Sequence, residues 1–269
     1  MTMQKILVDG HVHGHSCFDT LEFFDHAAAN FNAADGVGGT AARCLMLTES
    51  AGDHFFEDLF EKTGRAGRAS WSVRATAESE SVLVSRGADT TLVVVAGSQI
   101  ATRERLEVLA LGSRAVFRPG LSLFEAVSAA AAAGAVPVIP WGFGKWWLAR
   151  GRLVDALLRA PDVPRFFLGD NGGRPRIAPP PRLFHLAVER GVGVLPGSDP
   201  LPFPNQVSKV GGYGFVLRGT FAADWPAASV KRILAGLDGS PQAFGRRETV
   251  PGFVRAQLGM QWRLRRGMR

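Results

Sequence analysis

Three of the six histidines in the chain lie within five residues of one another, as His11, His13 and His15. They follow the apolar residues 6–8, which predict a short buried strand. Side chains alternate between two faces in an extended chain, so His11 and His13 are expected to point to the same side. Neutral imidazole is a good ligand for zinc, iron, copper and nickel. The pair therefore predicts a metal site at the end of the first strand; the alternative is that both histidines form only local hydrogen bonds.

The rest of the chain alternates apolar, strand-like segments with helical ones. A capping box, Ser122 with Glu125, begins one helix, and Gly134 ends it. Residues 70–86 fit either strands or a strand and a short helix, and the spacing up to residue 111 suggests some antiparallel pairing. Strands that alternate with helices indicate a parallel sheet, and the number of such units favours a closed barrel over an open sheet. The expected strands are residues 6–8, 43–48, 92–96, 106–111, 136–139, 165–169, 192–195 and 213–217; the other expected helices are 21–34, 54–61, 145–159, 181–190, 226–235 and 253–264.

Polar residues end several of these predicted strands. In a barrel of parallel strands, the C-terminal strand ends meet at one face, and active sites form there. Three carboxylates from three strands, added to two histidines, indicate a metal site better than three separate helix caps do. The residues at these ends are His11, His13, Glu49, Gln99, Trp141, Asp170 and Asp199.

The composition is that of a globular protein, with 46% apolar residues among 269. This length fits one large α/β domain or two small ones. No apolar run approaches the ~20 residues that a membrane span needs, and the N-terminus lacks the pattern of a secretory signal. The two cysteines, Cys17 and Cys44, are too few for a disulfide framework. We therefore expect a cytoplasmic protein that does not enter a membrane.

The net charge of +7 could serve either nucleic acid or a smaller anion. The arginines are scattered, apart from a cluster at residues 263–266, and the chain has a single tyrosine. No basic stripe interleaved with aromatic residues is present, so a solvated basic surface is predicted. We therefore expect a small anionic molecule, and not nucleic acid, as the partner; the sequence leaves the oligomeric state open.

The segment Asp9-Gly10-His11-Val12-His13 resembles the first motif of the PHP family, named for polymerase and histidinol phosphatase domains. Residues 47–50, 96–100, 138–141 and 197–201 follow in the order of the later family motifs. The resemblance covers roughly residues 4–217. It implies an α/β fold of the distorted (β/α)7 TIM-like barrel type, several bound metal ions and, for many members, hydrolysis of phosphoesters. We therefore expect one PHP-like domain over residues 1–269, with a C-terminal helical extension at about 226–265.

Part of the family's ligand set is replaced in this chain. The positions that match are His11, His13 and Asp199. The positions that differ are Ser50, Gln99, Trp141 and Leu201. Gln99 stands where the family has a glutamate that bridges two metal ions, and a neutral amide bridges cations poorly; tryptophan does not ligate. We therefore expect one divalent ion of the kinds that the resemblance implies (zinc, manganese or iron), held by the three matching residues, with Glu49 or Asp170 as additional candidate ligands.

Two imidazoles and one carboxylate around a metal ion leave coordination positions open for catalysis. A metal in such a site lowers the pKa of a bound water molecule and polarises a substrate oxygen. Asp170 or Glu49 could accept the proton of that water. His15 and His54 are candidates to replace missing ligands.

Several residues are candidates for binding the substrate. Lys145 follows the glycine-rich residues 142–144 at the start of a predicted helix, a suitable place for an anion. Arg174 and Arg103 could bind a phosphate or a carboxylate. Gln99 and Trp141, at strand ends, complete the predicted binding set. Together with the resemblance to PHP proteins, these residues lead us to expect a metal-dependent hydrolase, of the phosphoesterase type that the resemblance implies, acting on a small anionic substrate through a metal-activated water.

Two other classes of function remain open. The loss of four ligand positions suggests a PHP-like barrel without catalysis that binds a ligand or regulates a partner. Trp141, Phe143 and Trp146 could then line an apolar pocket, whereas Trp147 fits core packing. Nucleic-acid binding rests on charge and on the likeness to polymerase-associated domains, and it ranks last.

Overall fold

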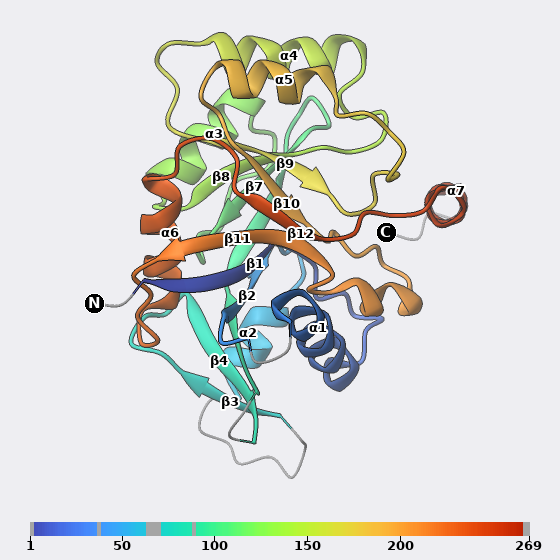
Figure 1. Ribbon diagram of the computed structural model, residues 1–269. Helices are drawn as coiled ribbons and strands as arrows, with labels where there is room; N and C mark the ends of the chain where they lie inside the picture. The colour runs from blue at the N-terminus through green and yellow to red at the C-terminus, as the bar shows by residue number, and fades with distance from the viewer. Residues whose placement is uncertain (1–2, 37–38, 63–70, 88–89, 266–269) are drawn as a thin grey trace.

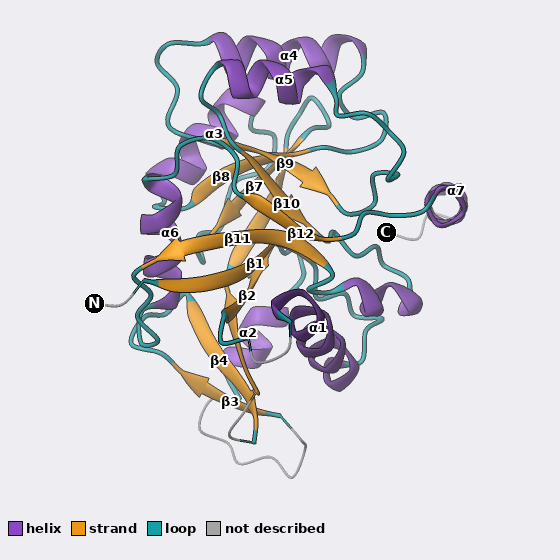
Figure 2. Cartoon of the chain, viewed as in Figure 1, coloured by secondary structure: helices purple, strands orange, loops and turns teal. Residues whose placement is uncertain are grey.

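The computed structural model describes residues 3–36, 39–62, 71–87 and 90–265, and in these ranges two mixed β-sheets are surrounded by helices (Figures 1 and 2). The larger sheet has the strand order β12-β11-β1-β2-β5-β4-β3. At its centre, β1 pairs in parallel with β2 and antiparallel with β11. Its strands are β1 (Gln4–Val12), β2 (Ala42–Leu47), β3 (Ser72–Ala75), β4 (Ser81–Arg86), β5 (Thr90–Val95), β11 (Tyr213–Gly219) and β12 (Gln242–Gly245).

The smaller sheet has the order β10-β9-β8-β7-β6. The pairs β8–β9 and β9–β10 are parallel, whereas β6–β7 and β7–β8 are antiparallel. Ala96 alone separates β5 from β6, so the chain passes from one sheet to the other at this residue. The strands are β6 (Gly97–Ala101), β7 (Glu107–Leu111), β8 (Val136–Pro140), β9 (Phe167–Asn171) and β10 (Val194–Gly197).

The helices begin where the sequence supplies capping groups. The Asp19 carboxylate accepts the N–H groups of Leu21 and Glu22 at the start of α1, and Ser122 forms the predicted capping box with Glu125 at the start of α3. None of the helices in the described ranges is long and apolar enough to cross a bilayer. The helices are α1 (Thr20–Asp35), α2 (Phe55–Phe60), α3 (Leu123–Ala132), α4 (Leu148–Arg159), α5 (Arg182–Glu189), the 3-10 helix η1 (Pro204–Lys209), α6 (Pro226–Ala235) and α7 (Val250–Arg265).

Apolar side chains of β1 pack on both sides of the larger sheet. Leu7 belongs to a core that includes Phe23 and Phe24 of α1. Ile6 and Val8 belong to a second core, which the smaller sheet joins through residues such as Leu109. Burial on both faces explains why β1 is a continuous apolar run and does not alternate with polar residues. The metal-site motif at its end is therefore anchored in the middle of the molecule.

The closed (β/α)7 barrel predicted from the sequence is wrong, because the described strands form two mixed sheets that do not close. The reason lies in the short connections of the first half of the chain. Residues 76–80 join β3 to β4, and residues 102–106 join β6 to β7. A parallel pair needs a crossover of about a dozen residues or more, so connections this short produce antiparallel hairpins. Parallel strand–helix–strand units occur at β1-α1-β2 and from β8 to β10, and the hairpins between them interrupt the alternation that indicated a barrel.

Candidate metal centre

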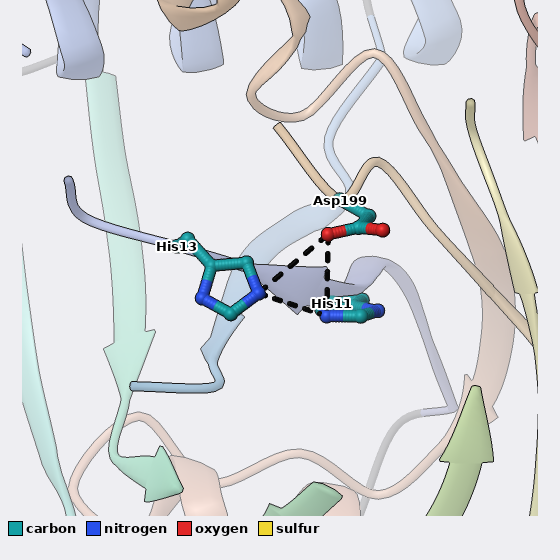
Figure 3. Close-up of side chains that lie close together, drawn as sticks. All are labelled: His11, His13 and Asp199. Carbon is teal, nitrogen blue, oxygen red and sulfur yellow. Dashed lines mark hydrogen bonds and ion pairs between the residues drawn. The ribbon is translucent and has the colours of Figure 1, made fainter. Parts of the chain in front are cut away.

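The end of β1 and the segment after β10 bring His11, His13 and Asp199 together (Figure 3). The Nε2 atoms of the two histidines are 3.0 Å apart. The Asp199 Oδ1 atom is 3.4 Å from the His11 Nε2 atom and 3.5 Å from the His13 Nε2 atom. In the described ranges, this is the one group of three or more such side chains placed to share a metal ion. The structure thus brings together the three residues predicted as ligands.

The backbone around Asp199 is shaped to make this approach possible. The Asp199 N–H donates to the His11 carbonyl oxygen over 2.8 Å. Asp199 itself has a φ of 47°, in the left-handed region that aspartate tolerates better than most residues. Gly197 lies so close that a Cβ atom there would overlap the main chain of His11. A glycine is therefore required at this position for β10 to approach β1.

Asp9, two residues before His11, is fully buried and binds the main chain where β1 meets the segment after β10. Its carboxylate accepts the N–H groups of His11, Ser198 and Gly211. Burial raises the pKa of Asp9 to about 7, against the lowering effect of these hydrogen bonds. Asp9 therefore positions the main chain that carries His11 and Asp199, and it is not part of the candidate ligand group. The sequence motif contained this residue, but nothing in the motif indicated its role.

The three side chains fit one divalent cation. Ligand atoms about 2.1 Å from a single ion lie about 3.0–3.4 Å from one another, close to the distances found here. Burial, followed by the nearby His11 ring, lowers the pKa of His13 to about 3, so this imidazole is neutral, as a ligand must be. The buried Nδ1 atom of His13 has no hydrogen-bond partner in the structure. The negative charge of Asp199 complements the two imidazole groups.

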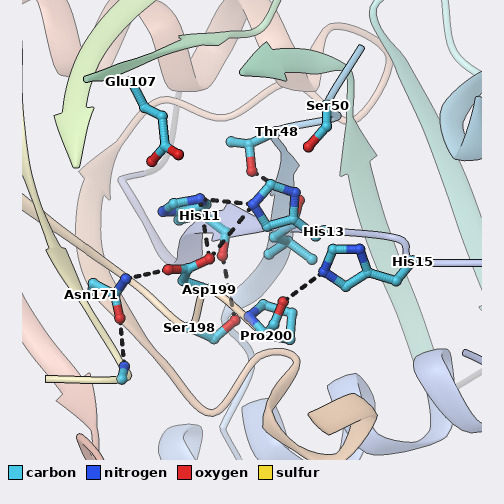
Figure 4. A network of polar contacts seen from close by, with 12 residues as sticks. His11, His13, His15, Thr48, Ser50, Glu107, Asn171, Ser198, Asp199 and Pro200 are labelled. Carbon is cyan, nitrogen blue, oxygen red and sulfur yellow. Dashed lines mark hydrogen bonds and ion pairs between the residues drawn. The ribbon is translucent and has the colours of Figure 1, made fainter. Parts of the chain in front are cut away.

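Neighbouring side chains hold the ligands in place (Figure 4). Asn171 donates from Nδ2 to the Asp199 carboxylate, and its Oδ1 atom accepts the Gly173 N–H. The His15 Nε2–H donates to the Pro200 carbonyl oxygen over 2.9 Å, and its ring stacks on His13 at 5.1 Å. Such outer contacts fix the orientation of metal ligands. His15 thus lies beside the site, and no contact places it in the ligand group.

Lys145 lies near the trio, in the turn before α4, and forms an ion pair with Glu107 at the start of β7. In the view of Figure 4, the Glu107 carboxyl group lies next to the His11 ring, with no contact drawn between them. Burial raises the pKa of Asp199, but His11, His13 and Lys145 outweigh it and hold that pKa below its usual value. The sequence predicted Lys145 but missed Glu107. The available signal was a charged residue at the head of an otherwise apolar strand.

Asp170 and Arg174 form a buried pair away from the metal group. The Arg174 Nε and Nη2 atoms donate to the two Asp170 oxygens over 2.7 and 2.8 Å, and the Tyr213 hydroxyl donates to Asp170 over 2.7 Å. Arg174 also donates to two main-chain carbonyl oxygens. Both side chains are therefore fully engaged within the protein, which leaves neither open to a substrate.

The other predicted site residues are spread over the molecule. Arg103 is exposed and pairs with Glu104 and Glu125. His54 is exposed at the start of α2, and the half-buried Gln99 lies on β6, where its N–H donates to the Glu49 carbonyl oxygen. Trp141, in contrast, lines a cavity of about 50 Å³ beside Asp199. Leu201, at another replaced ligand position, lines it too.

Glu49, predicted as a proton acceptor, lies at the start of α2. Its carboxylate accepts the Phe56 N–H over 3.1 Å. Burial raises the pKa of Glu49 to about 7; the hydrogen bonds to the α2 amides oppose this, and the charges of Asp53 and Glu57 add to it. Its place is therefore that of a helix-capping group.

We expect Glu49→Gln to change how stability depends on pH. The pKa of Glu49 is about 7 in the folded protein and near 4.5 when unfolded, so the folded state holds the proton more tightly. The stability this proton provides is present at acid pH and is lost as pH rises through 7. Glutamine keeps the acceptor oxygen and removes the ionisation. The measurement is the free energy of unfolding in urea, with EDTA present. From pH 5 to pH 8, the stability of the variant relative to the native protein is expected to increase by about 1–2 kcal/mol, after allowance for solvent screening. An unchanged difference across that range would contradict this placement.

No family model matches the chain, and no curated protein matches it. Among solved structures, PsfC from Pseudomonas syringae PB-5123 matches with a TM-score of 0.60 and 14% identity, over 96% of this chain and 98% of that one. An endonuclease Q in complex with a 27-mer duplex matches with a TM-score of 0.51 and 13% identity, over 87% of this chain and 57% of that one. PfuEndoQ, a lesion-specific endonuclease from Pyrococcus furiosus, matches with a TM-score of 0.50 and 11% identity, over 87% of this chain and 56% of that one.

The chain shares its fold with PsfC and endonuclease Q. At these identities the likeness concerns the fold alone. It supports the resemblance to PHP proteins at that level, while membership of the PHP family stays a proposal.

The expectation that nucleic acid is not a partner is corrected by the same comparison. Two of the similar structures are endonucleases, and one of them was determined with a duplex substrate that carries an abasic lesion at the active site. The expectation had rested on the absence of a basic stripe in the sequence. A fold can gather basic residues from distant segments, so a linear stripe is not needed.

Proposed function

We propose that this protein is a metal-dependent hydrolase that cleaves phosphodiester bonds in nucleic acid. The observation that carries the proposal is the convergence of His11, His13 and Asp199 on a volume that one cation would fill. The likeness of fold to endonuclease Q supports the choice of substrate class. PHP-type chemistry, as implied by the motif at residues 9–13, is consistent with both.

A divalent cation bound here would supply Lewis-acid activation of a phosphoryl oxygen and of water. His11 and His13 contribute neutral nitrogen donors, and Asp199 contributes the negative charge. Lys145 places a positive charge beside this group and would attract a phosphate. Asp170 binds Arg174 and Glu49 binds the α2 amides, so we propose Glu107 as the proton acceptor, a role that requires its ion pair with Lys145 to open.

Helix α7 lies over the cavity beside Asp199. Phe253, Ala256 and Gln257 of α7 line this cavity, whose volume of about 50 Å³ holds water but not a nucleotide. Phe253 contacts Phe143, with the ring centroids 5.2 Å apart. A nucleic acid that reached Asp199 through this cavity would contact α7.

The test is an assay of the protein loaded with manganese, zinc or iron. We expect cleavage of end-labelled single- and double-stranded oligonucleotides and of bis(p-nitrophenyl) phosphate, and loss of both activities in EDTA. His11→Ala is expected to remove the activity, whereas the control His185→Ala, at an exposed position on α5, keeps it. Bound metal without hydrolysis would overturn the proposal in favour of a binding protein. Equal activity in His11→Ala would show that a contaminant is responsible.

A further inference from the structure

A second cavity, of about 220 Å³, lies next to the metal centre. Ser198 and Gly172 line it, and each is the sequence neighbour of a residue in the site, Asp199 and Asn171. The ion pair between Lys209 and Glu248 borders both this cavity and the one beside Asp199. The basic residues that line the second cavity are Arg176, Lys209, Arg246 and Arg247.

Two of these arginines are held in place without losing their charge. The Arg176 Nε–H donates to the Arg247 carbonyl oxygen over 2.6 Å. Arg247 in turn donates from Nη2 to the Arg176 carbonyl oxygen over 3.1 Å and from Nη1 to the Pro175 carbonyl oxygen over 3.4 Å. All these acceptors are neutral main-chain groups. Each arginine side chain is therefore held by the main chain of the other, and in the described part of the chain neither forms an ion pair with a carboxylate.

The cavity has little negative charge to compensate them. Glu248 is the one acidic residue among those that line it, and it is paired with Lys209. Arg246 is exposed, and no carboxylate partner for it occurs in the described part of the chain. Like charges held close together repel, and an anion between them removes that cost. The cavity is thus built to receive negative charge.

The surrounding backbone is fixed before any ligand arrives. The Arg176 N–H donates to the Glu248 carbonyl oxygen over 2.9 Å, and the Glu248 N–H donates to the Gly172 carbonyl oxygen over 2.8 Å. A β-bridge joins Pro175 to Glu248. A site fixed in this way loses little conformational freedom on binding. Planar guanidinium groups are well suited to phosphate, which they can bind through two parallel hydrogen bonds.

We propose that the cavity bordered by Arg176, Arg246 and Arg247 binds a phosphate group of the nucleic-acid backbone next to the metal centre. The source of the phosphate rests on the proposed function, whereas the charge arrangement does not. Because the two cavities share Lys209 and Glu248, a strand could place one phosphate in the basic cavity and a neighbouring one at the metal. The basic cavity would then align the substrate for cleavage.

The experiment measures binding with EDTA present, so that it is independent of hydrolysis. Inorganic phosphate is titrated calorimetrically, and a fluorescein-labelled oligodeoxynucleotide is titrated by anisotropy at several salt concentrations. The test variants are Arg246→Gln, whose side chain is exposed, and the double variant Arg176→Gln with Arg246→Gln. Arg152→Gln, at an exposed position on α4, is the matched control.

We expect the double variant to weaken phosphate binding about tenfold or more and the control to leave it unchanged. For the oligonucleotide, the slope of log affinity against log salt is expected to become shallower by about one or two units. Phosphate binding lost without a change in that slope would assign the cavity to a free phosphate and overturn the backbone assignment. Equal binding by all variants would overturn the cavity itself. If the protein hydrolyses nucleic acid but its cavity variants bind normally, the proposed function stands and the phosphate cavity does not. If the cavity binds phosphate but the protein shows no hydrolysis, the phosphate cavity stands and the proposed function does not.

Discussion

Changing His13 to alanine is expected to abolish metal binding while leaving the fold intact. His13 contributes one of three protein ligands, so we expect affinity for the metal to fall by more than the roughly 10- to 100-fold that loss of a supporting contact causes. Its Nδ1 atom has no protein partner, so the substitution strands no hydrogen-bonding group at that end of the ring. The measurement is the metal content, by elemental analysis, of protein purified without chelator or histidine tag.

The native protein is expected to hold about one equivalent of zinc, manganese or iron, as three protein ligands imply. His185→Ala is the matched control and should retain the metal. Thermal melts in EDTA check the fold of the variant without the contribution of the metal. Full occupancy in His13→Ala would show that the metal lies elsewhere. Two or more equivalents in the native protein would mean that further side chains, Glu107 first among them, join the centre.

Replacing Asp170 with asparagine is expected to destabilise the protein by about 3–5 kcal/mol. Arg174 is 4% exposed, and both of its bonds to Asp170 are short. Removal of the carboxylate charge leaves a buried guanidinium group without its counter-ion. The free-energy cost of that unpaired charge is larger than the net stabilisation that the intact ion pair provides. The measurement is the free energy of unfolding in urea at pH 7.

The double variant Asp170→Leu with Arg174→Met provides the matched comparison. Replacement of both partners by apolar groups is often close to neutral, so most of the lost stability should return. Asp155→Asn, which breaks an exposed pair with Arg159, is the surface control and should change little. A stable but inactive Asp170→Asn protein would instead support the catalytic role that the sequence predicted for this residue.

The metal centre could be predicted because its signal was local. Alternation along a strand put His11 and His13 on one side, and β1 bears this out. At β9 the same reasoning could not choose between the adjacent Asp170 and Asn171, of which only one can face the candidate metal group. Asn171 binds Asp199, while Asp170 binds Arg174 on the other side. The position of a strand end predicts that two adjacent residues lie near a site. Which of the two side chains faces the site is determined by how the strand packs.

The overall architecture was harder to predict because it depends on pairing between distant segments. Most expected helices and strands occur within a few residues of their predicted limits. The sequence analysis missed β12, which is short, and also missed β6, because the glycine and polar residues of β6 lack a β pattern. The basic cavity had no linear signal either, because Arg176 and Arg247 meet only after folding.

The contacts of Asp9 bear on the order in which the molecule folds. Its bonds to Ser198 and Gly211 span 189 and 202 residues of sequence. Closing loops of this length costs chain entropy before the contacts can stabilise the structure. Such long-range contacts therefore form slowly. Local elements such as α3, with its own capping box, can form early. The candidate metal centre is therefore expected to be among the last parts of the protein to assemble, and a cation bound there would join β1 of the larger sheet to the segment that follows β10 of the smaller one.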